Sequence, residues 1–253
     1  MPRRLIPVLA ALTLALAVPA QAAEVKVAVA ANFSAAIRAL QPKFEAASGH
    51  TMRISTGSTG KLYAQIRNGA PFGVFLAADS RRPRKLDAGG YVAEDGRFTY
   101  AQGRIALWSP APDRVKGPAT LARTDFRHLA IANPKTAPYG LAARQTLQAL
   151  GHWQALRGRI VRGENIGQTH QFVASGNADL GFVALSQISG PNRPEAGSRW
   201  LVPQRHYAPI RQQAVLLADA ADNPAARALV TYLRGPEAAA VIRAFGYTVP
   251  GGD

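Results

Sequence analysis

The stretch VKVAVAANFSAAIRALQPKFEAASGH, residues 25–50, decides the fold. Its first seven residues, 25–31, form a valine-rich apolar run of the kind found in a buried strand. Apolar residues then recur at helical spacing, at Phe33, Ile37, Leu40 and Phe44. Gly49 is a typical end for such a helix. A buried strand that leads into an amphipathic helix is the unit of a parallel sheet covered by helices.

Similar units continue along the chain. Strands are predicted at Met52–Ser55, Val74–Ala78, Arg104–Trp108, His128–Ala132, Arg159–Val161, Leu180–Ala184, Trp200–Val202 and Gln213–Ala218. Helices are predicted at Thr59–Asn68, in the basic stretch that ends at Gly89-Gly90, at Gly140–Leu150, and on either side of Gly235-Pro236. About ten strands in a chain of this length favour two α/β lobes over one.

The composition restricts the classes of function. The 253 residues include no cysteine, which excludes a disulfide scaffold, a thiolate metal site and a cysteine nucleophile. Lys and Arg outnumber Asp and Glu by 30 to 15, for a net charge of +15. Such an excess of positive charge indicates an anionic partner: a nucleic acid, a membrane surface or a small anion.

The N-terminus predicts export. Arg3 and Arg4 precede the apolar run Leu5–Val18, and Ala20-Gln21-Ala22 has the small-x-small pattern of a signal-peptidase site. We therefore expect a signal peptide at residues 1–22 that is cleaved, leaving a periplasmic protein. The alternative is an uncleaved membrane anchor. Export counts against nucleic acid as the partner.

Four predicted helices begin with small, polar or amide-rich turns. They begin near Asn32, at Ser58 and Thr59, at Pro138-Tyr139-Gly140, and at Asn165-Ile166. Each turn has an ordinary interpretation as a helix cap. Four such turns after predicted strands also favour one site lined by N–H and hydroxyl donors, because helix N-termini attract anions.

Enzyme and metal motifs are sparse. The five histidines show no metal-binding spacing, and STGSTGKL, residues 55–62, departs from a nucleotide-binding phosphate loop. Asp79 at the end of a strand and Ser58 are the candidates for an exported hydrolase, although Asp79 is better placed to cap a helix. We therefore expect no catalytic residue, no cofactor and no metal cation site.

Several stretches resemble one known family. VAVAANFSAAI (27–37), GSTGKLYAQIRNGAPF (57–72), VFLAAD (74–79), RFTYAQGRIALWSP (97–110) and YLRGPEAAAVIRAFGY (232–247) are similar to the periplasmic molybdate-binding proteins of ABC importers. The similarity extends from Val25 to about Val249. The GSTGKLYAQI and GPEAA…GY patterns are its most specific parts.

The resemblance implies an α/β fold of the two-lobed type II periplasmic binding protein kind. Each lobe would be a mixed, mostly parallel sheet flanked by helices, and closure of the lobes would capture the ligand. Lobe one is expected at 23–100 plus 206–253, and lobe two at 101–205. A monomer that delivers molybdate or tungstate to a membrane permease is the expected function.

The resemblance also implies the ligand residues. They are Asn32, Ser58, Thr59, Tyr139 and, through its amide, Ile166, with Ala31 or Phe33 as further amide donors. Some members use a tyrosine at the position of Ala184, so its hydroxyl would have to come from elsewhere, with Tyr139 as the candidate. The rival functions are a receptor for another oxyanion such as sulfate, the exported hydrolase, and a basic nucleic-acid binder.

Overall fold

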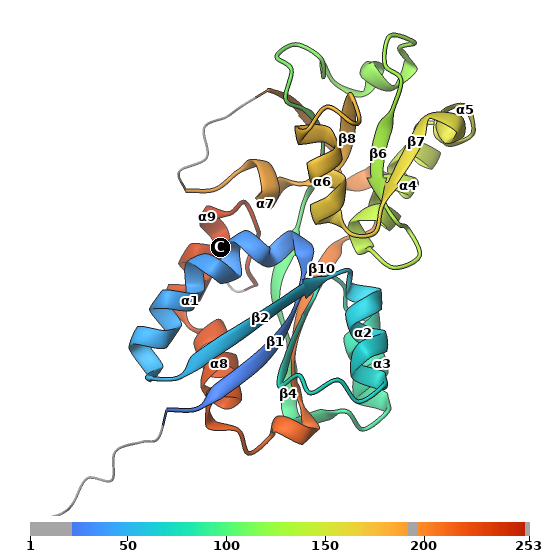
Figure 1. Ribbon diagram of the computed structural model, residues 1–253. Helices are drawn as coiled ribbons and strands as arrows, with labels where there is room; N and C mark the ends of the chain where they lie inside the picture. The colour runs from blue at the N-terminus through green and yellow to red at the C-terminus, as the bar shows by residue number, and fades with distance from the viewer. Residues whose placement is uncertain (1–21, 192–196, 251–253) are drawn as a thin grey trace, which may run out of the picture.

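The apolar runs form two separate five-stranded sheets in the computed structural model, which describes residues 22–191 and 197–250 (Figure 1). The predicted signal peptide, residues 1–22, lies outside the described residues except for Ala22. Two sheets of mixed strands flanked by helices confirm the predicted fold class. Within the described ranges, no helix is both long enough and apolar enough to cross a membrane.

The first sheet has the strand order β2-β1-β3-β10-β4. Its strands are β1 (Glu24–Ala30), β2 (Thr51–Gly57), β3 (Val74–Ala77), β4 (Val92–Gly103) and β10 (Ile210–Leu217). β1 pairs in parallel with β2 and β3, whereas β10 is antiparallel to β3 and β4. The three parallel strands therefore end at the same edge of the sheet.

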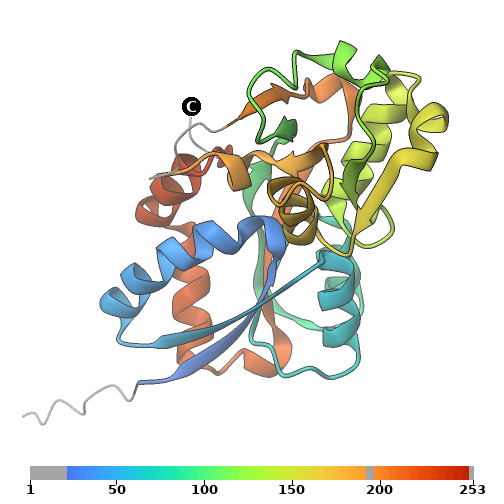
Figure 2. The same cartoon turned by 45° about the horizontal axis from the view of Figure 1, so that its top comes forward.

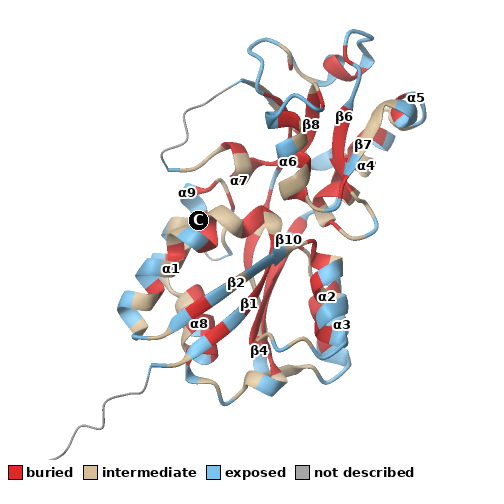
Figure 3. Ribbon diagram, in the orientation of Figure 1, coloured by how far each residue is buried: buried red, intermediate tan, exposed pale blue. Residues whose placement is uncertain are grey.

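Helices cover both faces of this sheet, which is why β3 and the last four residues of β1 are buried (Figure 3). One face packs against α1 (Ser34–Ser48), α8 (Pro224–Arg234) and α9 (Pro236–Ala244). The other face packs against α2 (Thr59–Arg67) and α3 (Arg81–Ala88).

The second sheet repeats this plan with the order β7-β6-β8-β5-β9. Its strands are β5 (Ile105–Ser109), β6 (Leu129–Ala132), β7 (Ile160–Gly163), β8 (Leu180–Ala184) and β9 (Ser198–Leu201). Its helices are α4 (Pro138–Ala149), α5 (Trp153–Leu156), α6 (Ile166–Ala174) and α7 (Leu185–Ile188). Short 3-10 segments lie at Ala31–Phe33, Pro118–Ala122, Arg157–Arg159, Gln204–His206 and Ala218–Ala220.

The chain passes between the two sheets twice, and Figure 2 shows the two halves facing each other. It leaves the first sheet at Gly103 and enters the second at Ile105, and it returns between Leu201 and Ile210. β4 thus extends three residues beyond the boundary expected at 100/101, whereas the boundary expected at 205/206 lies between β9 and β10. The exact limits of the lobes stay a prediction.

β4 is the strand that the sequence pattern did not predict. The residues Glu94-Asp95-Gly96 are typical of a turn, and Asp95 has a positive φ of 51°. The pairing of β4 with β10 contains register shifts that accommodate these residues within a long edge strand. Alternation of apolar and polar residues is lost at such irregularities, so the pattern failed here.

Candidate anion-binding site

Four helix beginnings meet in one small pocket between the two sheets. Each follows a parallel strand: β1 leads to the 3-10 turn before α1, β2 to α2, β6 to α4, and β7 to α6. The pocket is lined by Ala30, Ala31, Asn32, Gly57, Ser58, Thr59, Ala78, Ala137, Pro138, Tyr139, Asn165 and Ile166. The pocket is small: the volume that the centre of a water-sized molecule can occupy is about 10 Å³. All five residues predicted from the sequence line this pocket.

The lining carries no charged side chain among the residues that the structure describes. It presents the first turns of helices, whose leading N–H groups have no partner within the helix. Each helix N-terminus carries roughly half a positive charge. The site is therefore suited to a small anion held by neutral donors.

Two of the residues that line the pocket at the start of α2 carry hydroxyl groups. Ser58 is the N-cap of this helix, and its Oγ accepts a hydrogen bond from the N–H of Lys61 at 3.4 Å. Thr59 Oγ1 accepts one from the N–H of Ala78 at 3.1 Å, which ties α2 to the end of β3. In both contacts the hydroxyl is the acceptor, so its proton remains available to a bound anion.

The second sheet contributes main-chain groups and one cap. Pro138 occupies the first turn of α4, where a missing N–H costs nothing. Asn165 caps α6 by accepting from the N–H of Gln168 at 3.0 Å, and Ile166 is the first residue of that helix. The sequence placed the turn at Asn165-Ile166 among the four helix beginnings of the site, but it identified the side chain of Asn165 only as a cap.

Asn32 has a different role from that of a simple side-chain ligand. Its Nδ2 donates to Gln212 Oε1 at 2.8 Å and to the hydroxyl of Tyr247 at 3.0 Å. Its carbonyl accepts from the hydroxyls of Tyr247 at 2.8 Å and Ser186 at 2.9 Å. What Asn32 offers the pocket is therefore its main chain at the start of the helix. Phe33, the other expected amide donor, packs edge-on against Tyr100 and Tyr247.

Gln212 is the centre of this buried network and was missed by the sequence analysis. It is fully buried in β10, accepts from the hydroxyl of Tyr100 at 3.1 Å, and donates to that of Tyr139 at 3.2 Å. The phenol of Tyr139 thus faces β10 and Gly103, where an added Cβ would overlap its oxygen. A glutamine pair at 212–213 beside an apolar strand was the available signal.

The phenols of this network are uncharged at neutral pH. Burial raises the pKa of Tyr100 and of Tyr139 well above the ordinary value, and raises the pKa of Tyr247 to about 12. The network therefore supports the pocket without adding a negative charge that would repel an anion.

We expect alkaline pH to destabilise the fold through these phenols. The folded-state pKa of Tyr247 lies above the value of about 10 for an unfolded tyrosine, so the unfolded chain loses its proton first. Stability is retained below pH 10 and falls above it, by about 1.4 kcal/mol per pH unit for this residue up to about pH 12. Urea unfolding between pH 8 and 11 measures the slope. Y247F should have a shallower slope, and an unchanged slope would contradict the assignment.

The carboxylate proposed for a rival hydrolase is already engaged. Asp79 accepts from the N–H of Arg82 at 2.9 Å and pairs with its guanidinium at 2.5 Å. Ser58, the other candidate, caps α2. In the described ranges no three histidine or carboxylate residues gather as a metal site would require.

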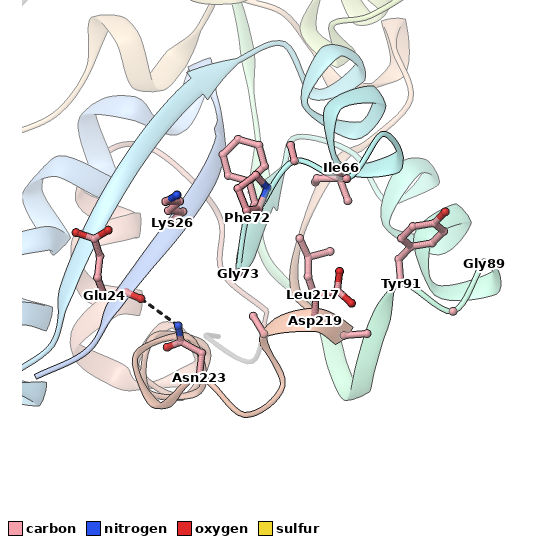
Figure 4. A pocket seen from close by; sticks show the side chains of 16 residues that line it. Glu24, Lys26, Ile66, Phe72, Gly73, Gly89, Tyr91, Leu217, Asp219 and Asn223 are labelled. Carbon is pink, nitrogen blue, oxygen red and sulfur yellow. Dashed lines mark hydrogen bonds between the residues drawn. The ribbon is translucent and has the colours of Figure 1, made fainter. Parts of the chain in front are cut away.

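Two larger hollows differ from the pocket in chemistry. One, of about 510 Å³, lies at the far end of the first sheet and is lined by Lys26 but also by the carboxylates of Glu24 and Asp219 (Figure 4). Those carboxylates make it a poor anion site. The other, of about 580 Å³, adjoins the pocket through Ala31, Asn32 and Asn165, and is lined by both Arg38 and Glu164.

Comparisons with known proteins identify the family. Residues 25–248 match the family model described as bacterial extracellular solute-binding protein. The chain is 54% identical over 233 residues to the molybdate-binding protein ModA of Azotobacter vinelandii, covering 92% of each. It is 46% identical over 237 residues to ModA of Rhodobacter capsulatus, covering 94% of this chain and 93% of that one.

A solved structure shows the same architecture. The periplasmic molybdate-binding protein of Azotobacter vinelandii aligns with a TM-score of 0.87 and 44% identity, over 89% of this chain and 99% of that one. This similarity covers nearly the full length of both proteins. The chain therefore belongs to the bacterial extracellular solute-binding proteins and, within them, to the ModA molybdate-binding family.

Proposed function

We propose that this chain is the substrate-binding component of an ABC importer and that it captures molybdate, with tungstate as an equivalent ligand. The observation that carries the proposal is the uncharged pocket formed where four helices begin. Relatives named for molybdate binding support the choice of anion. The chain performs no chemistry on its ligand and requires no cofactor.

The donor set favours a fully deprotonated dianion. The proposed donors are the hydroxyls of Ser58 and Thr59 and the main-chain N–H groups of Asn32, Tyr139 and Ile166. A protonated phosphate would need an acceptor, and of the described residues that line the pocket none has a carboxylate. Sulfate has the charge and shape of molybdate but is smaller, so it would leave several fixed donors without a partner.

Capture is proposed to occur by closure of two lobes, 23–100 plus 206–253 and 101–205. The ligand binds the closed form better and so shifts the equilibrium toward it. The excess positive charge raises the rate of encounter with an anion over about 8 Å at physiological salt. After cleavage of residues 1–22 the protein acts in the periplasm as a monomer and delivers the anion to a membrane permease.

Thermal melts of the mature protein test this function. Molybdate and tungstate at a hundredfold excess over their Kd should add about 2.7 kcal/mol to the free energy of unfolding. For a chain of this size that is a rise in Tm of roughly 5–11 °C. Sulfate and phosphate at the same concentration should leave Tm within about 1 °C. A rise with sulfate alone would keep the fold and refute the ligand, and no rise with any anion would refute the function.

A further inference from the structure

The two halves of the molecule touch along a seam beside the anion pocket. One side of the seam is formed by α2 and α3, and the other by the loop between β6 and α4, residues 133–137 (Figure 1). Gly60 N–H donates to the carbonyl of Thr136 at 2.8 Å. Lys61 and Glu164 form an ion pair that also joins the two halves.

Arg82 is the buried residue of this seam. Its side chain is 9% exposed, and its Nη1 is fixed by the carboxylate of Asp79 at 2.5 Å. Its Nη2 donates to the carbonyl of Lys135 in the opposite half at 3.0 Å. A planar guanidinium held on one edge by a carboxylate presents its other edge in a fixed direction, which the ammonium of a lysine does not do.

Gly60 is required for this approach. A Cβ at Gly60 would lie 2.8 Å from Arg82 Nη2 and 3.0 Å from both Cα and the carbonyl oxygen of Thr136. Those distances leave no room for a side chain while the halves are in contact. At Gly60 the two halves of the molecule are therefore in close van der Waals contact, although they belong to different sheets.

One polar atom in the seam is left without a partner. In the described part of the chain, the Oγ1 of Thr136 is buried and makes no hydrogen bond. A buried hydroxyl without a partner disfavours the state that buries it, whereas separation of the two halves would return it to water. Arg82 and Thr136 therefore act in opposite directions on the same contact.

The loop that receives these contacts leads directly into the anion pocket. Lys135 and Thr136 precede Ala137, Pro138 and Tyr139, which line it, whereas Arg82 does not line it. We propose that Arg82 is a positioning residue which, by holding residues 133–137 against the opposite lobe, stabilises the closed form and retains the anion. This inference rests on the proposed function, and the Thr136 hydroxyl limits the strength of the contact.

Affinity and release rates for molybdate test the proposal with three variants. R82K keeps a cation beside Asp79 but loses the fixed second edge, so Kd should rise about tenfold, mostly through a faster koff. T136V is nearly isosteric and removes the partnerless hydroxyl, so Kd should fall by about fivefold. R84K, at an exposed arginine of the same helix, is the matched control and should bind as the wild type does.

Lobe separation provides a readout that does not depend on any anion. The chain has no cysteine, so dyes can be placed by Ala88→Cys and Ala155→Cys, at exposed positions on α3 and α5 in opposite halves. Without ligand, R82K should show a larger mean distance between the dyes than the wild type, and T136V a smaller one. Variants that match the wild type in distance and in koff would overturn the role of Arg82. A wild type that binds none of the oxyanions would overturn the proposed function, while the distances would still report on the seam.

Discussion

Asn165→Asp should weaken molybdate binding by about a thousandfold at pH 7 while leaving the fold intact. Asn165 lines the pocket and caps α6 through Oδ1. Aspartate is as good an N-cap as asparagine, so the stability of the ligand-free protein should change by less than about 0.5 kcal/mol. The substitution therefore keeps the helix cap and changes only the charge of the pocket, since it adds a negative charge where the dianion is proposed to bind.

The size of this effect has a ceiling that also predicts its pH dependence. A carboxylate beside a dianion either remains charged and repels it or takes up a proton when the anion binds. Protonating a carboxyl with a pKa near 3.9 at pH 7 costs about 4 kcal/mol, which corresponds to about a thousandfold in Kd. That cost falls by about 1.4 kcal/mol for each pH unit, so the affinity of N165D should recover about tenfold per unit as the pH falls.

Isothermal titration between pH 5.5 and 8 measures this dependence. The Kd of the wild type should be nearly independent of pH over the range, because the pocket lining holds no carboxylate or histidine among the described residues and the pKa of Tyr139 is raised well above its ordinary value. Asn223 is the matched control: it caps α8 by accepting from the N–H of Ala226 at 3.1 Å, outside the pocket. N223D should bind as the wild type does. A pH-independent Kd for N165D close to that of the wild type would place the anion elsewhere.

The sequence predicted the strand-helix units because their signals are local. Valine-rich runs and helical spacing depend on which face of an element is buried, and a parallel sheet buries both faces of its strands. The four helix beginnings of the pocket were found for the same reason. Glycine, proline and capping residues act on the chain next to them, so their effect is visible without the fold.

The network around Gln212 was not predictable by such signals. Asn32, Tyr139 and Gln212 come from three elements far apart in the chain, and their hydrogen bonds exist only once β10 has returned to the first sheet. From the sequence alone, the position of Asn32 at a helix beginning suggested a direct ligand. In the structure its side-chain amide is instead hydrogen-bonded within that network. Likewise, the pairing of Asp79 with Arg82 three residues later is local, but the contact of Arg82 with the carbonyl of Lys135 across the seam has no local signature.

Gly140→Ala should lower the free energy of unfolding by about 3–5 kcal/mol, because the added methyl meets main chain that has no room to move. Gly140 lies in the first turn of α4, where a Cβ would overlap the carbonyl oxygen of Ala132 at the end of β6. A flexible side chain can swing away from such a clash. Here either the helix or the sheet must shift.

Thermal and urea unfolding of G140A should show a fall in Tm of roughly 6–20 °C. Because α4 begins at the pocket, the displaced first turn should also move the amide of Tyr139 and weaken molybdate binding at temperatures where the variant is folded. Gly158→Ala is the matched control: in the described structure a Cβ there meets nothing within 4 Å, and Gly158 has no positive φ. The free energy of unfolding of G158A should lie within about 0.5 kcal/mol of the wild-type value.

A G140A variant as stable as G158A would mean that α4 packs less closely on β6 than this structure shows, and the pocket formed by its first turn would then be adjustable rather than rigid. A rigid pocket is required if fixed donors are to distinguish molybdate from the smaller sulfate, so the stability of this one variant also tests the basis of selectivity.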